Sequence, residues 1–475
     1  MSQRLESLDR LSGMGGALWA SDLHRRHGRV SNLIGLIVEA TGVEAEVGEV
    51  CHVATGRNRP PVPAEVVGFR DSRTLLMPLG DMHGIGPGKT VRATGEPFRV
   101  PVGDDLLGRV VDGLGHPIDH GQAPTGPERS TQAAPPDPLE RTAIEDRVSL
   151  GVRALDTLVP CGRGQRLGIF AGSGVGKSSL LGMIARATSA DVNVICLVGE
   201  RGREVREFIT ESLGPALERS VVIVATSDQP ALVRIKAAFT ATTVAEHFRD
   251  QGLDVMLMMD SVTRFAMAQR EVGLAIGEPP ATRGYTPSVF ALLPKLLERS
   301  GTSARGSITG LYTVLVDGDD MNEPVADAVR SILDGHVVLS RELAHASHYP
   351  AIDVLQSVSR LVGQVVTPEV RSAGQRVRRL MAAHREKADL IAIGAYQPGG
   401  DPLVDEAIAK QGAIEAFLRQ RPDEASLAED ADRALLVLAG EEPRIDPLDE
   451  LAVAALAPAP VAPGPSAIPP LNLSV

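Results

Sequence analysis

A glycine-rich stretch that ends in a lysine and a serine is the part of the sequence with the clearest chemistry. Residues 171–178 have the sequence AGSGVGKS, after an apolar segment and before a helical one. Backbone N–H groups of such a stretch can curl around phosphates at the positive end of a helix. Lys177 would reach the outer phosphates, and the Ser178 hydroxyl would bind Mg²⁺. The predicted nucleotide-binding residues are Gly172, Ser173, Gly174, Val175, Gly176, Lys177, Ser178 and Ser179.

Two acidic residues stand at the ends of other apolar segments, where they could serve the same site. Asp260 ends the segment 255–259, and Glu200 follows the segment 192–198. In an open α/β sheet the ligand crevice lies outside the carboxyl ends of the strands, so both side chains would face the phosphates. We interpret Asp260 as the metal-side carboxylate, with capping of the following helix as a compatible second role. Glu200 could hold a water molecule in line with the γ-phosphate and act as a general base.

The elements that must position these residues are strands and helices that alternate after about residue 138. Short apolar stretches are separated by segments of helical composition, which predicts an α/β fold with a mostly parallel sheet covered by helices on both faces. The predicted strands lie at residues 167–170, 192–198, 221–225, 255–259 and 311–316.

Other compositions flank this α/β region. Between residues 28 and 100, short alternating segments broken by Gly, Pro and Asp predict a small antiparallel barrel. The proline-rich residues 124–138 predict an extended connector, and helical composition follows residue 368. We therefore expect an N-terminal regulatory or partner-binding segment (1–26), a β-barrel domain (27–100), an ATP-binding domain (101–368), a C-terminal helical domain (369–442) and a disordered Pro/Ala-rich tail (443–475).

The charge and the aromatic content argue against nucleic-acid binding. The sequence has 475 residues and a net charge of −12, which repels a phosphate backbone. Aromatic residues make up 3% of the chain, too few to favour stacking on single strands. The three cysteines show no C-x-x-C spacing, so neither a disulfide framework nor a zinc site is predicted.

The first residues predict a helix and show no secretion signal. They are charged throughout and lack the apolar core of a signal peptide, and the longest apolar runs are far shorter than the ~20 residues that span a bilayer. Leu5, Leu8 and Leu11 fall on one face of a predicted helix. That face either packs on its own domain or binds a partner protein or a membrane surface.

Several motifs together resemble the catalytic subunits of rotary ATP synthases and their protein-export relatives. These motifs are GVGKS at 174–178, GERGRE at 199–204, the strand that ends at Asp260, and YPAIDVLQSVSR at 349–360. Two further stretches, GEPPATRGYTPSVF at 277–290 and VDGDDMNEPVADAVR at 316–330, are most similar to the flagellar type III protein-export ATPases. The resemblance implies a small N-terminal β-barrel, a central RecA-like P-loop domain and a C-terminal helical domain. Injectisome ATPases are the alternative family.

The resemblance also implies roles for individual residues. Lys177 and Ser178 would act on ATP and Mg²⁺, with Glu200 as the water-activating base and Asp260 on the metal side. Arg360 would reach into the neighbouring subunit's site as an arginine finger. Arg201 would orient the base or the interface, with an ordinary salt bridge as the alternative. Tyr349 and Tyr396 would stack on adenine, or else each would fill a core.

The partners implied by the resemblance are those of a homohexameric export ATPase. They are a stator-like regulator on the N-terminal segment, a central stalk protein in the ring pore, an export gate, and chaperone–substrate complexes on the helical domain. The location would be cytoplasmic, with peripheral association at the inner face of the cell membrane. Two other classes are weighed against this hypothesis: a RecA-like hexameric nucleic-acid translocase, opposed by the negative charge, and a non-hydrolysing assembly subunit, opposed by the presence of Glu200.

Overall fold

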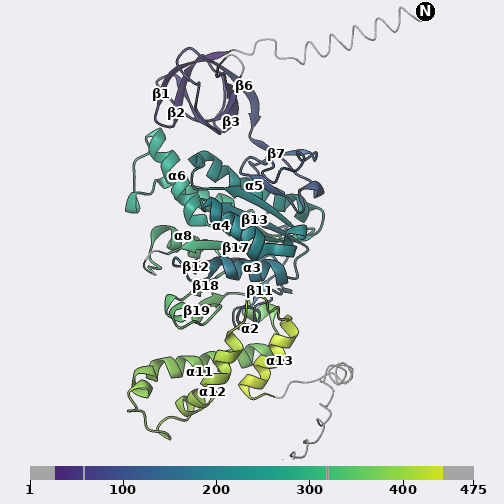
Figure 1. Ribbon diagram of the computed structural model, residues 1–475, viewed down its shortest axis with the longest axis vertical. Helices are drawn as coiled ribbons and strands as arrows, with labels where there is room; N and C mark the ends of the chain where they lie inside the picture. Colours follow the sequence, from purple (N-terminus) through teal and green to yellow (C-terminus); the bar gives the residue numbers. More distant parts are fainter. Residues whose placement is uncertain (1–26, 57–58, 317, 319, 442–475) are drawn as a thin grey trace, which may run out of the picture.

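The computed structural model describes residues 27–56, 59–316, 318 and 320–441. This part of the chain is elongated, with a barrel at one end, a nine-stranded sheet in the middle and helices at the other end (Figure 1). The predicted fold class is therefore confirmed. The N-terminal segment 1–26 and the tail 443–475, predicted to bind a partner and to be disordered, lie outside the described residues.

The barrel is closed, with strand order β1-β2-β5-β4-β3-β6. Closure pairs each strand on both sides, so the barrel leaves no open hydrogen-bonding edge. Alternate side chains point inward, and Val38, Cys51 and Leu76 are fully buried there. The strands are β1 (Gly28–Ile34), β2 (Ile37–Thr41), β3 (Glu49–Val53), β4 (Val62–Arg70), β5 (Arg73–Pro78) and β6 (Thr90–Pro97).

The central sheet has the order β19-β18-β12-β17-β15-β13-β14-β8, with short β16 beside β17. Its strands are parallel except β19 and β16, which run antiparallel to their neighbours. The carboxyl ends of β12, β13 and β15 therefore meet at one edge. The strands are β8 (Val110–Asp112), β12 (Arg166–Ala171), β13 (Val192–Val198), β14 (Ser220–Ala225), β15 (Asp254–Asp260), β16 (Gly301–Thr302), β17 (Ser307–Leu315), β18 (Gly335–Leu339) and β19 (Ile352–Ser359).

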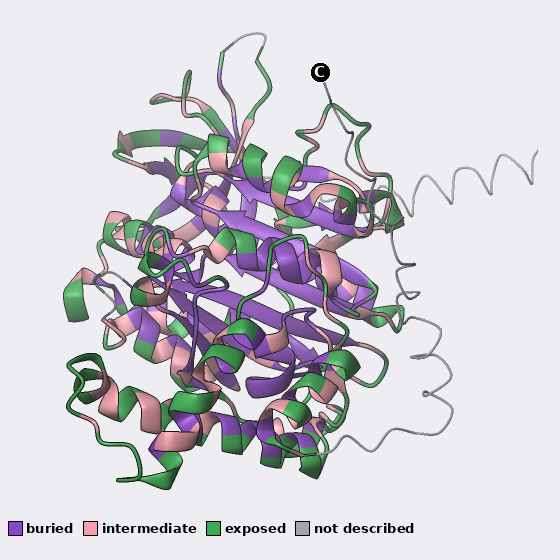
Figure 2. Cartoon of the chain, turned by 60° about the horizontal axis from the view of Figure 1, so that its bottom comes forward, coloured by how far each residue is buried: buried purple, intermediate pink, exposed green. Residues whose placement is uncertain are grey.

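Helices bury both faces of this sheet, as the continuous apolar strands predict. Figure 2 shows the strands buried beneath helices whose outer sides are exposed. One core includes α5 (Ala231–Asp250), α6 (Val262–Ile276), α7 (Pro287–Leu297) and α8 (Pro324–Ile332). The other includes α2 (Arg153–Leu158), α3 (Lys177–Ala187), α11 (Pro368–Ala392), α12 (Pro402–Leu418) and α13 (Ala428–Ala439). Among the described residues, no helix has the length and apolar character that a membrane span requires.

Shorter elements connect these parts. The predicted connector 124–138 contains one short strand, β9 (Glu128–Ser130), which pairs with β7 (Arg99–Pro101). The remaining short elements are β10 (Arg147–Val148), β11 (Cys161–Gly162), α4 (Gly202–Glu207), α9 (Arg341–His345), α10 (Val362–Val365), and the turns of helix η1 (Asp104–Leu106), η2 (Phe208–Leu213), η3 (Gly214–Arg219) and η4 (Thr282–Gly284).

Charged side chains connect the barrel and the C-terminal helices to the central region. The helices α11 to α13, residues 368–439, are hereafter called the helical part. Lys236 of α5 forms an ion pair with Glu65 of the barrel, and Arg70 donates to the carbonyl oxygen of Ile276 at 2.6 Å. At the other end, Arg147 holds both carboxylate oxygens of Asp432 at 2.9 and 2.7 Å. Such two-point pairing fixes orientation as well as distance.

Candidate nucleotide-hydrolysis site

The glycine-rich residues 171–178, hereafter the phosphate loop, connect β12 to α3, as the sequence predicts. Gly176 immediately precedes α3 with a φ of 90°, in the left-handed region that glycine adopts readily. A Cβ atom there would lie 3.5 Å from the ring of Tyr349, so the tyrosine ring lies directly beside the loop. The loop therefore joins a helix N-terminus, which favours anions, to an aromatic side chain.

Lys177 lies between the two predicted carboxylates. Its Nζ is 2.5 Å from Oδ1 of Asp260 and 3.6 Å from Oε1 of Glu200. Asp260, at the end of β15, is only 3% exposed, and the hydroxyl of Thr313 on β17 donates to the same Oδ1 at 2.8 Å. One ammonium group thus balances two largely buried carboxylates. The structure brings together residues that are 83 positions apart in sequence.

Ser261 caps helix α6 in this structure. Its side chain accepts the backbone N–H of Arg264, whereas the carboxylate of Asp260 faces Lys177 and Thr313. The second role suggested for Asp260, capping this helix, is therefore taken by the next residue. Asp260 remains free to act through its carboxylate at the phosphate loop.

The surroundings of Glu200 make its carboxylate a stronger base than that of an exposed glutamate. Burial raises the pKa of its carboxyl group, and the charge of Asp260 and a hydrogen bond with Glu204 raise it further, while Lys177 opposes them. A carboxyl group whose pKa is moved toward neutrality is better matched to proton transfer near pH 7 than an ordinary glutamate. The position and the electrostatics of Glu200 therefore suit a general base.

Arg264 is a further basic residue at this site, and the sequence motifs did not indicate it. It lies in the first turn of α6, and its side-chain carbons leave no room for a Cβ atom at Gly199, where such an atom would be 2.9 Å from Arg264 Cβ. The Nε atom of Arg264 is buried and has no hydrogen-bond partner in the described part of the chain. A buried N–H without a partner is costly, so it is a candidate donor to a phosphate oxygen. Its place four residues after Asp260 is the signal that sequence reasoning could have used.

Tyr349 and Tyr396 occupy different regions, although both were predicted to stack on adenine. The backbone carbonyl of Tyr349 accepts the N–H of Gln420, just beyond the C-terminal end of α12. The hydroxyl of Tyr396 donates to the carbonyl oxygen of Asp401, at the N-terminal end of the same helix. The 17 residues of α12 separate these contacts by about 25 Å. Within one chain, the structure brings Tyr349 to the phosphate loop and leaves Tyr396 at the far end of the helical part.

The two predicted arginines also lie apart from the phosphate loop. The side chain of Arg201 is 70% exposed and forms a salt bridge with Glu204 at 3.1 Å. Arg360 is exposed at the end of β19, where its backbone N–H donates to Asp334 and its side chain donates to the carbonyl of Arg330 at 3.4 Å. The backbone N–H of Asp334 in turn donates to the backbone carbonyl oxygen of Arg166, at the start of β12. Arg360 therefore lies at the sheet edge opposite to the one that carries the loop.

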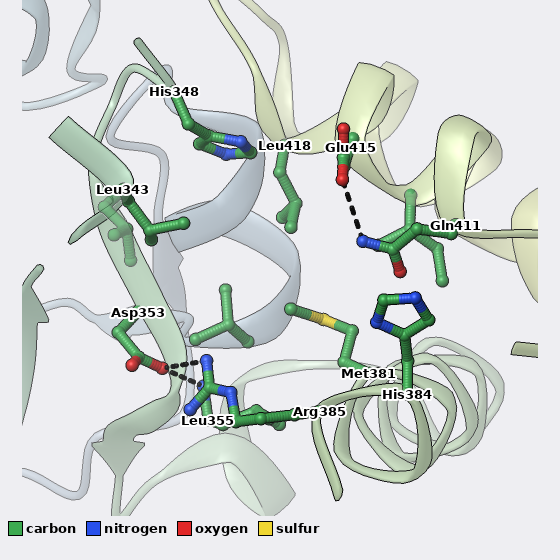
Figure 3. Close-up of a pocket in the computed structure, with 13 residues that line it drawn as sticks. Leu343, His348, Asp353, Leu355, Met381, His384, Arg385, Gln411, Glu415 and Leu418 are labelled. Atoms are coloured by element: carbon green, nitrogen blue, oxygen red, sulfur yellow. Dashed lines mark hydrogen bonds and ion pairs between the residues drawn. The ribbon is translucent and has the colours of Figure 1, made fainter. Parts of the chain in front are cut away.

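A cavity of about 140 Å³ lies between strand β19 and helices α11 and α12 (Figure 3). Asp353 of β19 and Arg385 of α11 form an ion pair at 3.0 Å on one side. Gln411 donates to Glu415 on the other side, within α12. His348 and His384 also border the cavity. It is separate from the phosphate loop, because none of the residues 171–179 lines it.

Comparison with known proteins identifies three family models along the chain. The beta-barrel domain of the ATP synthase alpha/beta family matches residues 30–95, and the nucleotide-binding domain of that family matches residues 151–359. The T3SS EscN ATPase C-terminal domain matches residues 366–436. The models therefore follow the barrel, the sheet and the helical part in turn.

Curated and solved relatives resemble most of the chain. The Flagellum-specific ATP synthase of Bacillus subtilis is 53% identical over 89% of this chain and 97% of its own length. The assembled ATPase EscN from the enteropathogenic E. coli type III secretion system is 48% identical, with a TM-score of 0.82 over 87% of this chain and 100% of its own. A structure of assembled EscN in complex with its central stalk EscO matches with a TM-score of 0.80, at the same identity and coverage.

Proposed function

The chain belongs to the ATP synthase alpha/beta family, in its branch of flagellar and type III secretion ATPases, and we propose that it hydrolyses ATP between the subunits of a homohexameric ring. Hydrolysis supports the delivery and unfolding of export substrates for flagellum assembly. The observation that carries this proposal is the division of the site: Lys177, Glu200 and Asp260 meet at one edge of the sheet, and Arg360 is exposed at the other. Two copies side by side would complete one site.

The residues present fit Mg²⁺ bound with ATP. Magnesium prefers oxygen ligands and is usually held by one or two protein groups together with substrate phosphates. Asp260 offers a buried carboxylate beside Lys177, and Ser178 stands at the second position of α3. Bound Mg²⁺ supplies positive charge that neutralises the developing charge on the phosphate oxygens.

The chain's own residues bind the nucleotide, accept the proton and stabilise the transition state. Backbone N–H groups of the loop and the ammonium group of Lys177 bind the phosphates, and Tyr349 stacks on the adenine. Glu200 accepts a proton from the attacking water, which its raised pKa favours. Arg264 donates to a phosphate oxygen, Arg201 orients the interface, and the neighbour's Arg360 stabilises the charge of the transition state. Tyr396 takes no part in the same chain's site, since its hydroxyl bonds at the end of α12 opposite to the Tyr349 contact, about 25 Å away along the helix.

The partners proposed for this ring are those of an export ATPase. The likeness to EscN in complex with its central stalk supports a stalk protein in the pore, near residues 277–290 and the acidic loop around Asp320. A stator-like regulator binds the N-terminal segment, and chaperone–substrate complexes bind the helical part before transfer to an export gate. The ring works in the cytoplasm, in peripheral contact with the cell membrane at the gate.

An injectisome is the second candidate system for the same activity. The likeness to EscN favours it, and the greater identity to the flagellar protein of Bacillus subtilis favours the flagellum. Deletion of the gene separates the two systems. Loss of flagellar filaments supports a role in the flagellum, and loss of secreted effectors with filaments intact supports a role in an injectisome.

Specific activity as a function of protein concentration tests the shared site. Turnover per chain should rise steeply across the range in which light scattering shows single chains assembling into rings, because each site needs Arg360 from a neighbour. The Arg360→Ala variant, followed over the same range, should stay nearly inactive. A wild-type specific activity that is the same before and after assembly would reject the proposal.

A further inference from the structure

Gln420 lies just beyond α12 and is almost completely buried, at 3% exposed. Its side-chain oxygen accepts the backbone N–H of Arg153 at 2.9 Å. Its side-chain nitrogen donates to the carbonyl oxygens of Gly151 and Glu424, both at 2.8 Å. An amide side chain has two donor hydrogens, and here both are used within the chain. Gln420 is therefore held in a single orientation between the helical part and the start of the nucleotide-binding region.

The backbone of Gln420 continues this network to the nucleotide site. Its N–H donates to the carbonyl oxygen of Tyr349 at 3.0 Å. The ring of Tyr349 lies beside Gly176 of the phosphate loop, although it is 44% exposed. A half-exposed ring has few packing neighbours to fix it, so its backbone must be held from elsewhere. The buried contacts of Gln420 provide that support.

Two arginines fasten the same segment to the nucleotide-binding region. Arg153 donates to the carbonyl oxygens of Phe417 and Arg419, at 2.9 and 2.5 Å. Arg186, in the last turn of the helix that follows the phosphate loop, donates to the carbonyl oxygen of Pro422 at 2.6 Å. The segment 417–424 is thus hydrogen-bonded to the nucleotide-binding region on both sides of Gln420. Because Gln420 binds the backbone of Tyr349, the position of Tyr349 depends on the position of this segment.

We propose that Gln420 is a positioning residue for the nucleotide base, which acts by fixing Tyr349 from the helical part of the chain. This inference rests on the proposed stacking of Tyr349 on adenine. Loss of the Gln420 side chain should weaken the binding of nucleotides that carry a base and leave the binding of bare phosphates unchanged. Because α12 ends beside Gln420, movement of the helical part would then reach the base through this residue.

The test compares ADP with pyrophosphate, each titrated with Mg²⁺ into the full-length chain by calorimetry. Gln420→Met keeps the length of the side chain and removes its three hydrogen bonds. It should weaken ADP binding about two- to tenfold, the amount expected for a displaced aromatic partner, and leave pyrophosphate binding unchanged. Gln411→Met, within α12, removes a hydrogen bond to Glu415 and should change neither affinity.

A double-mutant cycle with Tyr349→Ala decides whether Gln420 acts through the tyrosine. In the Tyr349→Ala background, Gln420→Met should have no further effect on ADP binding. The proposal would be overturned if the losses of ADP affinity caused by Gln420→Met and Tyr349→Ala multiplied in the double variant. It would also be overturned if Gln420→Met weakened pyrophosphate binding as much as ADP binding. If Gln420→Met does not fold, Gln420→Glu, which keeps the acceptor for Arg153, replaces it in every titration and is held to the same outcomes.

The cycle also separates this inference from the proposed function. If Tyr349→Ala leaves ADP binding unchanged, the stacking role proposed for Tyr349 is wrong. If Tyr349→Ala weakens ADP binding and the Gln420 variant does not, the stacking role stands and the positioning role of Gln420 is wrong.

Discussion

Tyr349 and Arg360 lie at opposite ends of strand β19, so the chain presents them at opposite edges of its central sheet. The ring of Tyr349 is beside Gly176, and Arg360 donates its backbone N–H to Asp334 at the start of β18. The eight residues of β19 span roughly 20 Å, which is more than an arginine side chain can reach. This separation is the reason for the proposal that Arg360 acts on the nucleotide of a neighbouring chain.

Replacement of Lys177 by alanine should abolish ATP turnover while the fold is kept. The phosphates lose their ammonium partner, and the carboxylates of Asp260 and Glu200 lose the charge that balances them. The free energy of unfolding should also fall by about 1–3 kcal/mol, the cost of leaving a buried charged group without its partner. Phosphate release and thermal melting measure the two effects. Lys387→Ala, at a salt bridge with Glu386 on α11, should change neither, and near-normal turnover of the Lys177 variant would refute the assignment.

Replacement of Arg264 by alanine should lower kcat by a factor on the order of 10², comparable to the loss of one donor to a developing charge. Its buried Nε has no partner among the described residues, and the Arg264 charge also acts on Glu200. Steady-state kinetics give the result. Arg270→Ala, on the same helix and stacked over the ring of Tyr285, serves as the control that keeps turnover. An unchanged kcat in the Arg264 variant would assign this residue a purely structural role.

The ion pair of Asp353 and Arg385 should make stability depend on pH. Burial would raise the pKa of Asp353, but hydrogen bonds from Arg385 and Gln356 outweigh it and hold the pKa below its usual value. Because the pKa is lowered in the folded state, the pair stabilises the fold above about pH 4 and loses this effect as the pH falls through the folded pKa. Arg385→Met should therefore lower the melting temperature at pH 7 and have a smaller effect at an acidic pH below the folded pKa of Asp353.

An exposed pair on the same helix provides the comparison. Arg376 of α11 pairs with Glu406, and the two side chains are 46% and 31% exposed. Arg376→Met should change the melting temperature little at either pH, because solvent screens an ion pair at the surface. A loss for Arg385→Met that is the same at pH 7 and at an acidic pH below the folded pKa of Asp353 would show that packing beside the cavity, and not the charge of Asp353, explains its effect.

The parts of the site that follow strands could be predicted from the sequence. Asp260 ends an apolar strand, Glu200 follows one, and Lys177 ends the glycine-rich loop that follows another; parallel strands bring such positions to one edge. Thr313 could not be assigned in this way, because its contact with Asp260 depends on strand order. The place of Arg264 after Asp260 was visible in the sequence, but its contact with Gly199 depends on the direction of its side chain. The separation of Tyr396 from Tyr349 depends on the length of α12, and the position of Arg360 depends on the antiparallel pairing of β19 with β18. These relations require the tertiary structure.

The most direct test of the shared site is a single-turnover measurement on rings that mix two inactive variants. Glu200→Gln removes the base and keeps Arg360, whereas Arg360→Ala removes the finger and keeps the base. Each variant ring alone should be nearly inactive, since an arginine finger contributes about 10³–10⁵ in rate. After subunit exchange, confirmed by native mass spectrometry, some interfaces combine an intact Glu200 with an intact Arg360. With less ATP than sites, these interfaces should hydrolyse it at nearly the wild-type rate. Mixed rings that remain as inactive as their parents would contradict the shared site.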